Sequence, residues 1–362
     1  GYSLRDFSNS IERRYGVERE AQTVLGLGFA QPLLKGAGIE STTAVIRVAE
    51  AEADIAFQTY RGQMMRVVAD AIAAYWDLAL ARERYRVRKE SERNAEEILR
   101  QNIARAEAGK IPETEVLEAR AGLAMRNSLV SEARQGIAAA MNAARSFYSA
   151  SAAQVEADVV PADPLAEAEV KPDFAEGLDH AFNFRAEYLA SRRKIEREEV
   201  KLVFAQNQRW PQLDLKGSYN MNGLASKPGP SWDDAMKQDY ETWTVGLELR
   251  IPLGGDKKAR SELEATRQRK RQALLEMKAV EVALANAVDT TIKGVGNAWE
   301  QVRYYGSIVE MTRQLLETEH AKFDAGKSNS RLLLEREENL NKAREAEIES
   351  LVRYRKALYQ LE

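Results

Sequence analysis

Proline spacing constrains this chain more than any other feature. Its nine prolines leave residues 33–111 and 253–362 without a single proline, and proline is the residue that most strongly breaks a helix. From residue 274 onward, apolar side chains recur in steps of three and four, while charged and polar residues fill the other faces. The seam consists of Leu284, Val288, Ile292, Val295, Trp299, Val302, Tyr305 and Val309. This period predicts an amphipathic helix with a narrow apolar stripe.

Both proline-free spans can hold unusually long helices. Residues 40–108 and 256–325 would each extend about 100 Å at about 1.5 Å per residue, and helices of that length need coiled-coil partners. The helices are interrupted at Gly109 and at Gly326. Since glycine readily supplies the left-handed residue that ends a helix, each interruption predicts a hairpin turn. The return helices are expected over 113–150 and 330–361.

Two segments have a period of two instead. Apolar and polar residues alternate over 212–221 and over 243–251, which is typical of strands with one apolar and one polar face. A weaker strand is expected over 23–30, with Thr23 and Phe29 on the same face. Glycine and proline in 222–242 predict a long exposed hairpin loop between the two clear strands.

The succession of strand, proline, long helix, glycine turn and return helix occurs twice. Phe29 to Leu33 corresponds to Leu249 to Leu253, and Ala108 to Lys110 corresponds to Ala325 to Lys327. We therefore expect two structural repeats joined by a proline- and acid-rich connector over 151–175. The first repeat covers 1–150, with a strand remnant over 1–31 and a helical hairpin over 40–150. The second covers 176–362, with a helix over 176–208, strands over 212–251 and a helical hairpin over 256–361.

Two features of the amino terminus concern the extent of the chain. Gly1 falls opposite Met221 of the second repeat, so most of the first strand of the first repeat is missing. The first residue is also not methionine. We therefore expect the natural chain to begin upstream.

Composition excludes several classes of function. The chain has no cysteine and two histidines, which leaves no thiolate chemistry and little for a zinc site, so we expect no metal and no cofactor. A net charge of −3, from 53 basic and 56 acidic residues, does not suggest a nucleic-acid binder. No Ser/His/Asp constellation can be assembled, and we predict no catalysis. No apolar run approaches the roughly 18 to 20 residues of a membrane helix, so any crossing must use strands.

The apolar strand faces need a partner. Three visible strands and a fourth implied by the repeat are too few to close a barrel, and open sheet edges in hydrocarbon leave backbone groups unsatisfied. Several chains must then contribute to one barrel. The lipid-facing residues would be Leu213, Leu215, Tyr219, Met221, Trp243, Val245, Leu247, Leu249 and Ile251, and the lumen-facing residues Asp214, Lys216, Glu248 and Arg250. The alternative is a soluble sandwich with one buried face.

These features together resemble the TolC-type outer membrane efflux protein family over essentially the whole chain. The matching pieces are the strand exits Gln31-Pro32-Leu33-Leu34 and Ile251-Pro252-Leu253-Gly254-Gly255, the two glycine tips, Arg185-Ala186-Glu187-Tyr188-Leu189 and Trp210-Pro211-Gln212-Leu213-Asp214-Leu215. The resemblance implies a mainly α fold in a homotrimer, whose twelve-stranded β-barrel in the bacterial outer membrane continues into an α-helical barrel in the periplasm. It further implies a passive duct for tripartite efflux or type I secretion, with a periplasmic adaptor, an inner-membrane pump and outer membrane lipid as partners.

In that family the hairpin tips close the entrance and receive the adaptor. The resemblance places Glu115, Phe323 and Glu335 at the pore entrance or gate. It assigns adaptor contact to Gly109, Lys110, Gly326 and Lys327. Carboxylate rings in a narrow pore attract cations and repel one another, so they tune selectivity and opening. Ser328 and Leu332 depart from the family pattern, since some members carry an arginine and an acidic residue there.

Two rival interpretations stay open at this point. The first is a soluble, elongated coiled-coil scaffold of the cell envelope, without a pore, whose short sheet caps the helices. The second is a hydrolase that uses Glu335 and Glu338, which lie three residues apart on one helical face. A scaffold would purify without detergent, whereas a duct would need it.

Overall fold

A computed structural model describes residues 1–7, 20–148, 159–165, 168–252 and 256–361. Several sequence predictions therefore fall outside the described residues. These are the middle of the strand remnant (8–19), two parts of the connector (151–158 and 166–167) and Leu253 to Gly255 at the second strand exit. The chain forms two compact units, one of residues 1–57 with 190–279 and one of residues 58–189 with 280–362. Each unit draws on both sequence repeats, and the division into repeats stays a prediction.

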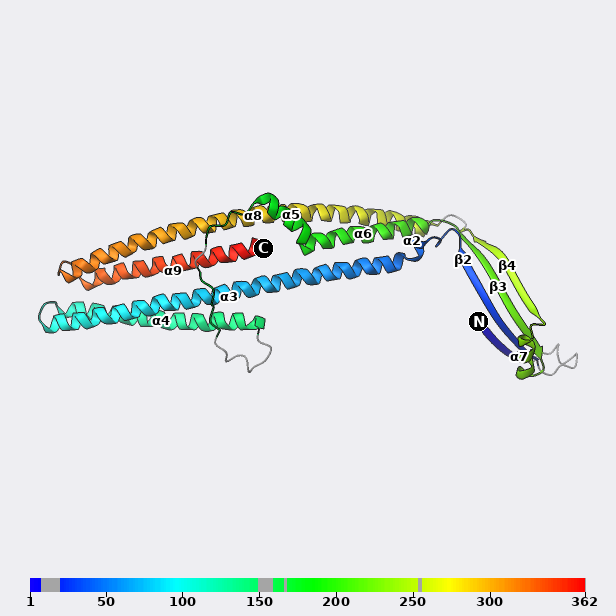
Figure 1. Ribbon diagram of the computed structural model, residues 1–362, viewed down its shortest axis with the longest axis horizontal. Coiled ribbons are helices and arrows are strands. Elements are labelled where there is room, and N and C mark those ends of the chain that lie inside the picture. The colour runs from blue at the N-terminus through cyan, green and yellow to red at the C-terminus, as the bar shows by residue number, and fades with distance from the viewer. Residues whose placement is uncertain (8–19, 149–158, 166–167, 253–255, 362) are drawn as a thin grey trace. The chain divides into compact units, whose positions relative to one another are not determined.

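The first unit contains a four-stranded antiparallel sheet in the order β1-β2-β3-β4 (Figure 1). The strands are β1 (Tyr2–Phe7), β2 (Glu20–Pro32), β3 (Gln212–Ala225) and β4 (Glu241–Arg250). The central pairing joins the two halves of the sequence, with Leu25 opposite Met221 and Phe29 opposite Gly217. Tyr219 lies opposite Trp243. Because side chains alternate along a strand, this register gathers the predicted apolar residues on one face.

The prediction of an exposed loop over 222–242 was wrong. Strand β3 continues to Ala225, and the helix α7 (Pro228–Met236) folds back onto the sheet. The hydroxyl of Ser231 lies 2.9 Å from the hydroxyl of Thr23 and 2.9 Å from the carbonyl oxygen of Gly223, and all of Ser231 is buried. The absence of a side chain at Gly223 permits this approach, since a Cβ there would lie 1.8 Å from the Ser231 carbonyl oxygen. Proline fits the first turn of a helix, where no backbone donor is needed.

The passage from strands to helices is fixed by one side chain, Asn207, at the end of α6 (Ala186–Asn207). Its Oδ1 accepts hydrogen bonds from the Gly36 amide at 2.6 Å and from the Ser41 hydroxyl at 3.0 Å. Its Nδ2 donates to the carbonyl oxygens of Leu34 at 3.3 Å and Ala37 at 3.2 Å. The loop between β2 and the short helix α2 (Ile39–Thr42) is thereby held against α6.

Long helices dominate the chain, as predicted. The helices α3 (Ala44–Glu107) and α8 (Lys257–Asp324) have 64 and 68 residues. Their return partners are α4 (Glu113–Tyr148) and α9 (Ser330–Leu361). Figure 1 shows each pair as an antiparallel hairpin. The fold is therefore mainly helical with a small antiparallel sheet, which confirms the predicted class.

The single helix predicted over 176–208 is instead two helices. The helix α5 (Phe174–Phe184) ends before Arg185, whose backbone is extended at φ −69° and ψ 123°, and α6 then begins at Ala186. Asp173 caps the start of α5, its carboxylate accepting the Ala175 amide at 3.0 Å. Within the described residues no helix is both long and apolar enough to cross a membrane.

The core of the second unit follows the predicted stripe. Val295, from the predicted seam, is fully buried with Tyr354 of α9, and Trp299 and Val302 pack against them. Trp76 of α3 is buried with Val352 of α9. Burial of large side chains at helical spacing supplies most of the stabilisation of long helices, which propensity alone does not provide.

The connector crosses these helices and is held by two tyrosines. Tyr75 of α3 donates to the Asp163 carboxylate at 2.6 Å, and its oxygen accepts the Ala162 and Asp163 amides, each at 3.2 Å. Tyr354 of α9 donates to the Ala168 carbonyl at 3.1 Å and accepts the Val170 amide at 2.9 Å. Burial and the Asp163 carboxylate raise the pKa of Tyr75.

Candidate functional site

The two hairpin turns have the same backbone design. Gly109 and Gly326 have φ values of 66° and 68°, in the left-handed region that favours glycine. The Lys110 amide donates to the Arg105 carbonyl at 2.9 Å, and the Lys327 amide donates to the Lys322 carbonyl at 2.8 Å. These bonds close each helix in a Schellman motif. Both lysine side chains are exposed at the turns.

Glu115, expected at a pore entrance, is engaged in a contact between the two hairpins. Its Oε2 accepts a hydrogen bond of 2.9 Å from the amide of Ser330, the first residue of α9. Asn102 of α3 is fully buried beside it. The Asn102 Nδ2 lies 2.6 Å from the Ser330 hydroxyl oxygen and 3.2 Å from the Glu115 carbonyl oxygen. A carboxylate at a helix N-terminus accepts a hydrogen bond from an otherwise free amide, and its negative charge interacts favourably with the positive end of the helix dipole.

Phe323, expected at the gate, lies in the core of the tips. Its side chain is 5% exposed and belongs to one apolar cluster with residues of α3, α4 and α9. The guanidinium carbon of Arg105 lies 4.5 Å from the ring centroid, and an Arg105 nitrogen reaches the Asp324 carboxylate at 3.4 Å. The other members of the cluster are Ala95, Ile98, Ala119, Leu333 and Leu334. Phe323 thus joins the two hairpins by packing.

Of the two predicted entrance carboxylates, Glu335 is the one whose side chain is free to contact solvent and ions. It is exposed on α9 and makes no hydrogen bond or ion pair with any residue in the described parts of the chain. Glu338, its partner in the hydrolase interpretation, pairs instead with Lys342 at 2.7 Å and raises the pKa of that lysine. The two carboxylates are therefore in different electrostatic surroundings, set by the lysine one turn further along α9.

Ser328, one of the two departures from the pattern of the TolC-type resemblance, makes a contact within its own hairpin. Its hydroxyl donates to the buried carboxylate of Glu319 in α8, and this hydrogen bond lowers the pKa of Glu319. Lys322 lies 3.6 Å from the same carboxylate. The turn before α9 is consequently tied back to α8 within its own hairpin.

Sequence reasoning missed a buried ion pair further from the turns. Arg126 of α4 and Glu337 of α9 are 6% and 3% exposed, and their charged atoms lie 3.4 Å apart. The Arg126 guanidinium also donates to the Leu334 carbonyl at 3.0 Å and to the Ser91 hydroxyl at 3.1 Å. Burial raises the pKa of Glu337 despite the nearby arginine. The available signal was that Glu337 shares the helical face of Leu333, Leu334 and Leu340, an apolar face in which a charge stands out.

The sheet has one apolar and one polar face, as the alternation predicts. On β4 the apolar side chains of Trp243, Val245, Leu247 and Leu249 are 71%, 65%, 67% and 56% exposed. On the other face Lys216 pairs with Glu248, and Arg250 reaches Glu248 at 2.9 Å. Ser218 and Thr244 share a hydrogen bond of 2.7 Å. Asp214 is 8% exposed and accepts from Gln212 at 2.7 Å.

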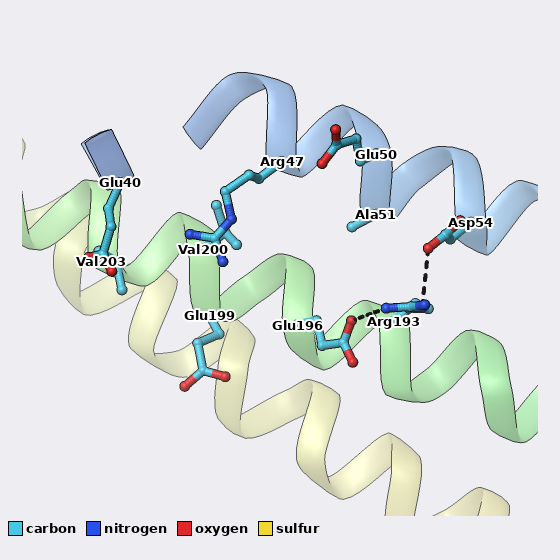
Figure 2. Close-up of a pocket in the computed structure, with 10 residues that line it drawn as sticks. All are labelled: Glu40, Arg47, Glu50, Ala51, Asp54, Arg193, Glu196, Glu199, Val200 and Val203. Carbon is cyan, nitrogen blue, oxygen red and sulfur yellow. Dashed lines mark hydrogen bonds and ion pairs between the residues drawn. The ribbon is translucent and has the colours of Figure 1, made fainter. Parts of the chain in front are cut away.

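A further hollow, of about 450 Å³, lies between the first turns of α3 and the middle and second half of α6, and Figure 2 shows the residues that line it. Arg193 bridges Asp54 at 3.2 Å and Glu196 at 2.6 Å, and the Glu196 hydrogen bond raises the pKa of this arginine. The remaining charged lining residues are Glu40, Arg47, Glu50 and Glu199. Carboxylates outnumber arginines in this lining, but Asp54 and Glu196 already pair with Arg193.

The sequence matches the family model described as "Outer membrane efflux protein" over residues 8–147 and 185–362. The chain belongs to the outer membrane efflux protein family. Members of this family are passive channels, and the chain is accordingly not an enzyme. This assignment removes the hydrolase interpretation of Glu335 and Glu338.

Solved structures of outer membrane channels share the fold. The Campylobacter jejuni outer membrane channel CmeC is 16% identical, with a TM-score of 0.77 over 100% of this chain and 75% of that chain. The outer membrane protein VceC of Vibrio cholerae is 15% identical, with a TM-score of 0.77 over 100% and 84%. The open-state MtrE outer membrane channel of Neisseria gonorrhoeae is 17% identical, with a TM-score of 0.71 over 100% and 78%. No match was found among curated proteins.

Proposed function

We propose that the protein is the outer membrane exit duct of a tripartite efflux or type I secretion system. The observation that carries the proposal is a four-stranded sheet with one exposed apolar face, in the same chain as two long helical hairpins that end in matching turns. Four strands cannot close a barrel, but a homotrimer would supply twelve. The helical hairpins would then form a tunnel in the periplasm that continues the barrel.

In this proposal the two faces of the sheet meet different surroundings, lipid on one side and water on the other. On the apolar face Ile251 is exposed and Leu213, Leu215 and Met221 are half-buried, and all four would face outer membrane lipid, with Tyr219 and Trp243 near its boundary. The ion-paired and hydrogen-bonded polar residues Asp214, Lys216, Glu248 and Arg250 would face the water-filled lumen. Lumen-facing charges that are already paired bring little net field to the pore.

The tips are proposed as the entrance, with distinct roles for the three predicted residues. Glu335 would present its free carboxylate to passing ions. Glu115 and Phe323 would act indirectly, because they hold the two hairpins of one subunit together. Lys110 and Lys327, exposed beside Gly109 and Gly326, would contact a periplasmic adaptor, and an inner-membrane pump would supply the energy.

Planar-bilayer conductance of the purified protein tests the duct. We expect detergent-dependent trimers and small cation-selective openings. Glu335→Gln should reduce cation selectivity by removing a ring of charge, whereas Glu115→Gln should change the frequency of opening more than the selectivity. Glu300→Gln, at an exposed position within α8, is the matched control. A detergent-free, elongated dimer without conductance would support the scaffold interpretation instead.

A further inference from the structure

A second hollow, of about 390 Å³, lies in the first unit where strands give way to helices. Its charged and aromatic lining consists of Lys35, Arg209, Trp210, Arg250, Asp256 and Arg260. These residues come from three separate places in the sequence: the loop after β2, the joint between α6 and β3, and the passage from β4 to α8. The volume is within the range of sites for small organic molecules.

The charge of the lining is strongly positive in a chain whose net charge is −3. Four cations and one carboxylate line the hollow, but Lys35 pairs with that carboxylate and Arg250 pairs with Glu248 on the neighbouring strand. Asp256 lies 3.6 Å from Lys35 and accepts the Ala259 amide at 2.9 Å. Arg209 and Arg260 have no side-chain hydrogen bond or ion pair to any described residue. Two guanidinium groups are thus available to a ligand carrying negative charge.

Hydrogen bonds fix the loop that carries Lys35 against the end of α6 and the start of β3. The Asn207 side chain makes four hydrogen bonds to the loop that carries Lys35 and to α2. The Lys35 amide donates to the Pro211 carbonyl at 3.2 Å, and the Leu33 amide donates to the Leu213 carbonyl at 2.7 Å. A site on fixed backbone loses less conformational entropy when a ligand binds.

The hollow continues the polar face of the sheet. Gln212 and Arg250 both line it and lie directly opposite each other in the β3–β4 register, so they share a face. Gln212 bonds to Asp214 and Arg250 to Glu248, both on the polar face. Trp210, two residues before Gln212, is 59% exposed and adds an unoccupied aromatic surface beside the arginines.

We propose that this hollow binds organic anions that carry an aromatic ring, and that such anions are a class of solute passed by the duct. The arginines would hold the carboxylate or sulfonate, and Trp210 would stack on the ring. The inference rests on the proposed function for the statement that the polar face meets the solute. Binding of an anion to the hollow can be measured whether or not the polar face lines a pore.

The test is calorimetric titration of the detergent-solubilised full chain with 1-naphthoate. Cyclohexanecarboxylate supplies the charge without the ring, 1-naphthylmethanol supplies the ring without the charge, and inorganic phosphate is a simple anion. We expect 1-naphthoate to bind at least tenfold more tightly than each of the other three. Arg209→Gln/Arg260→Gln should weaken 1-naphthoate binding at least tenfold, and Trp210→Leu should weaken it severalfold.

The matched control is Arg134→Gln/Arg303→Gln, which removes two exposed arginines from the second unit and should leave binding unchanged. Circular dichroism checks that each variant is folded. Equal binding by both double variants would overturn the site, and phosphate binding as tight as that of 1-naphthoate would overturn its aromatic class. Conductance of the wild-type protein is recorded separately. If the wild-type protein conducts but does not bind 1-naphthoate, only this site is rejected. If it binds 1-naphthoate but does not conduct, the duct is rejected.

Discussion

The carboxylate of Glu115 in α4 accepts a hydrogen bond of 2.9 Å from the backbone amide of Ser330, which begins α9. A side chain from one hairpin therefore caps the helix of the other, across 215 positions of sequence. The contact is reinforced by the buried amide of Asn102. It links the two hairpins at their tips without a contribution from Ser328.

Removing this cap should loosen the start of α9. Glu115→Ala leaves the Ser330 amide without its acceptor, at a cost of about 1 kcal/mol. We expect faster amide hydrogen exchange over the first turn of α9, measured by mass spectrometry. Glu115→Gln keeps a side-chain oxygen acceptor and should have a smaller effect. Glu113→Ala, at an exposed position in the first turn of α4, serves as the control, and equal exchange in both alanine variants would contradict the capping role.

The buried pair of Arg126 and Glu337 should make stability depend on pH in a defined direction. Burial raises the pKa of Glu337, so the carboxyl group's contribution to stability is fully present below its ordinary pKa and is lost as the pH rises through the raised value. Arg126→Met removes the cation that pairs with Glu337 and should cost about 3 kcal/mol near pH 7. The loss should shrink as the pH is lowered from 7, because a protonated Glu337 carries no charge that needs a partner.

The measurement is the apparent Tm of the helical circular dichroism signal, recorded as the pH is lowered from 7. Arg126→Met/Glu337→Leu removes both charges and should recover most of the stability, because no unpaired ion is left in the core. A constant deficit for Arg126→Met at every pH would mean that packing, rather than charge, accounts for the loss.

The two turn glycines should respond to substitution in the opposite way from a glycine inside a helix. Gly109→Ala places a side chain at φ 66° and should destabilise the hairpin by about 1 kcal/mol. Gly136→Ala lies inside α4 with open space around the new methyl group, and should stabilise the helix by up to about 1 kcal/mol. Thermal unfolding of the two variants should shift the apparent Tm in opposite directions, and shifts of the same sign would refute the left-handed turn.

The contact of α7 with the sheet depends on Gly223. A Cβ at this position would lie 1.8 Å from the Ser231 carbonyl oxygen, so Gly223→Ala should push α7 off the strand and separate Trp232 from Tyr2, whose ring centroids are 5.3 Å apart. Hydrogen exchange over 228–236 should rise markedly. Gly246→Ala in β4 has nothing within 4 Å and should leave it unchanged. Unaltered protection in the Gly223 variant would show that α7 adapts without leaving the sheet.

Local sequence rules were sufficient for the long helices, the glycine turns and the two alternating strands. Proline-free length, the apolar period around Val295 and the left-handed preference of Gly109 act within a few residues of each position. The same rules failed at α7, because Pro228 and Pro230 were interpreted as loop residues when they occupy a first helical turn. They also failed at Arg185, where no proline or glycine marks the break between α5 and α6.

The tip contacts could not be predicted from spacing, because they join residues about two hundred positions apart. Which face of α9 becomes buried depends on how α4 packs against it, and that packing places Glu337 beside Arg126. Phe323 likewise owes its burial to Leu333 and Leu334 of α9 and to residues of the first hairpin. Sequence pattern thus identified the ends of the hairpins correctly, whereas the contacts between hairpins required the structure.

The tyrosine contacts of the connector have a mechanical consequence. Tyr75 belongs to the first hairpin and Tyr354 to the second, and both hold the same connector. Each phenol group donates one hydrogen bond to the connector and accepts at least one from its backbone amides. Only four residues separate Asp163 from Ala168, so a large displacement of α9 along α3 would break the hydrogen bonds at one of the two tyrosines. Longitudinal displacement of the hairpins is therefore opposed at mid-length, while splaying of their far ends leaves both anchors intact.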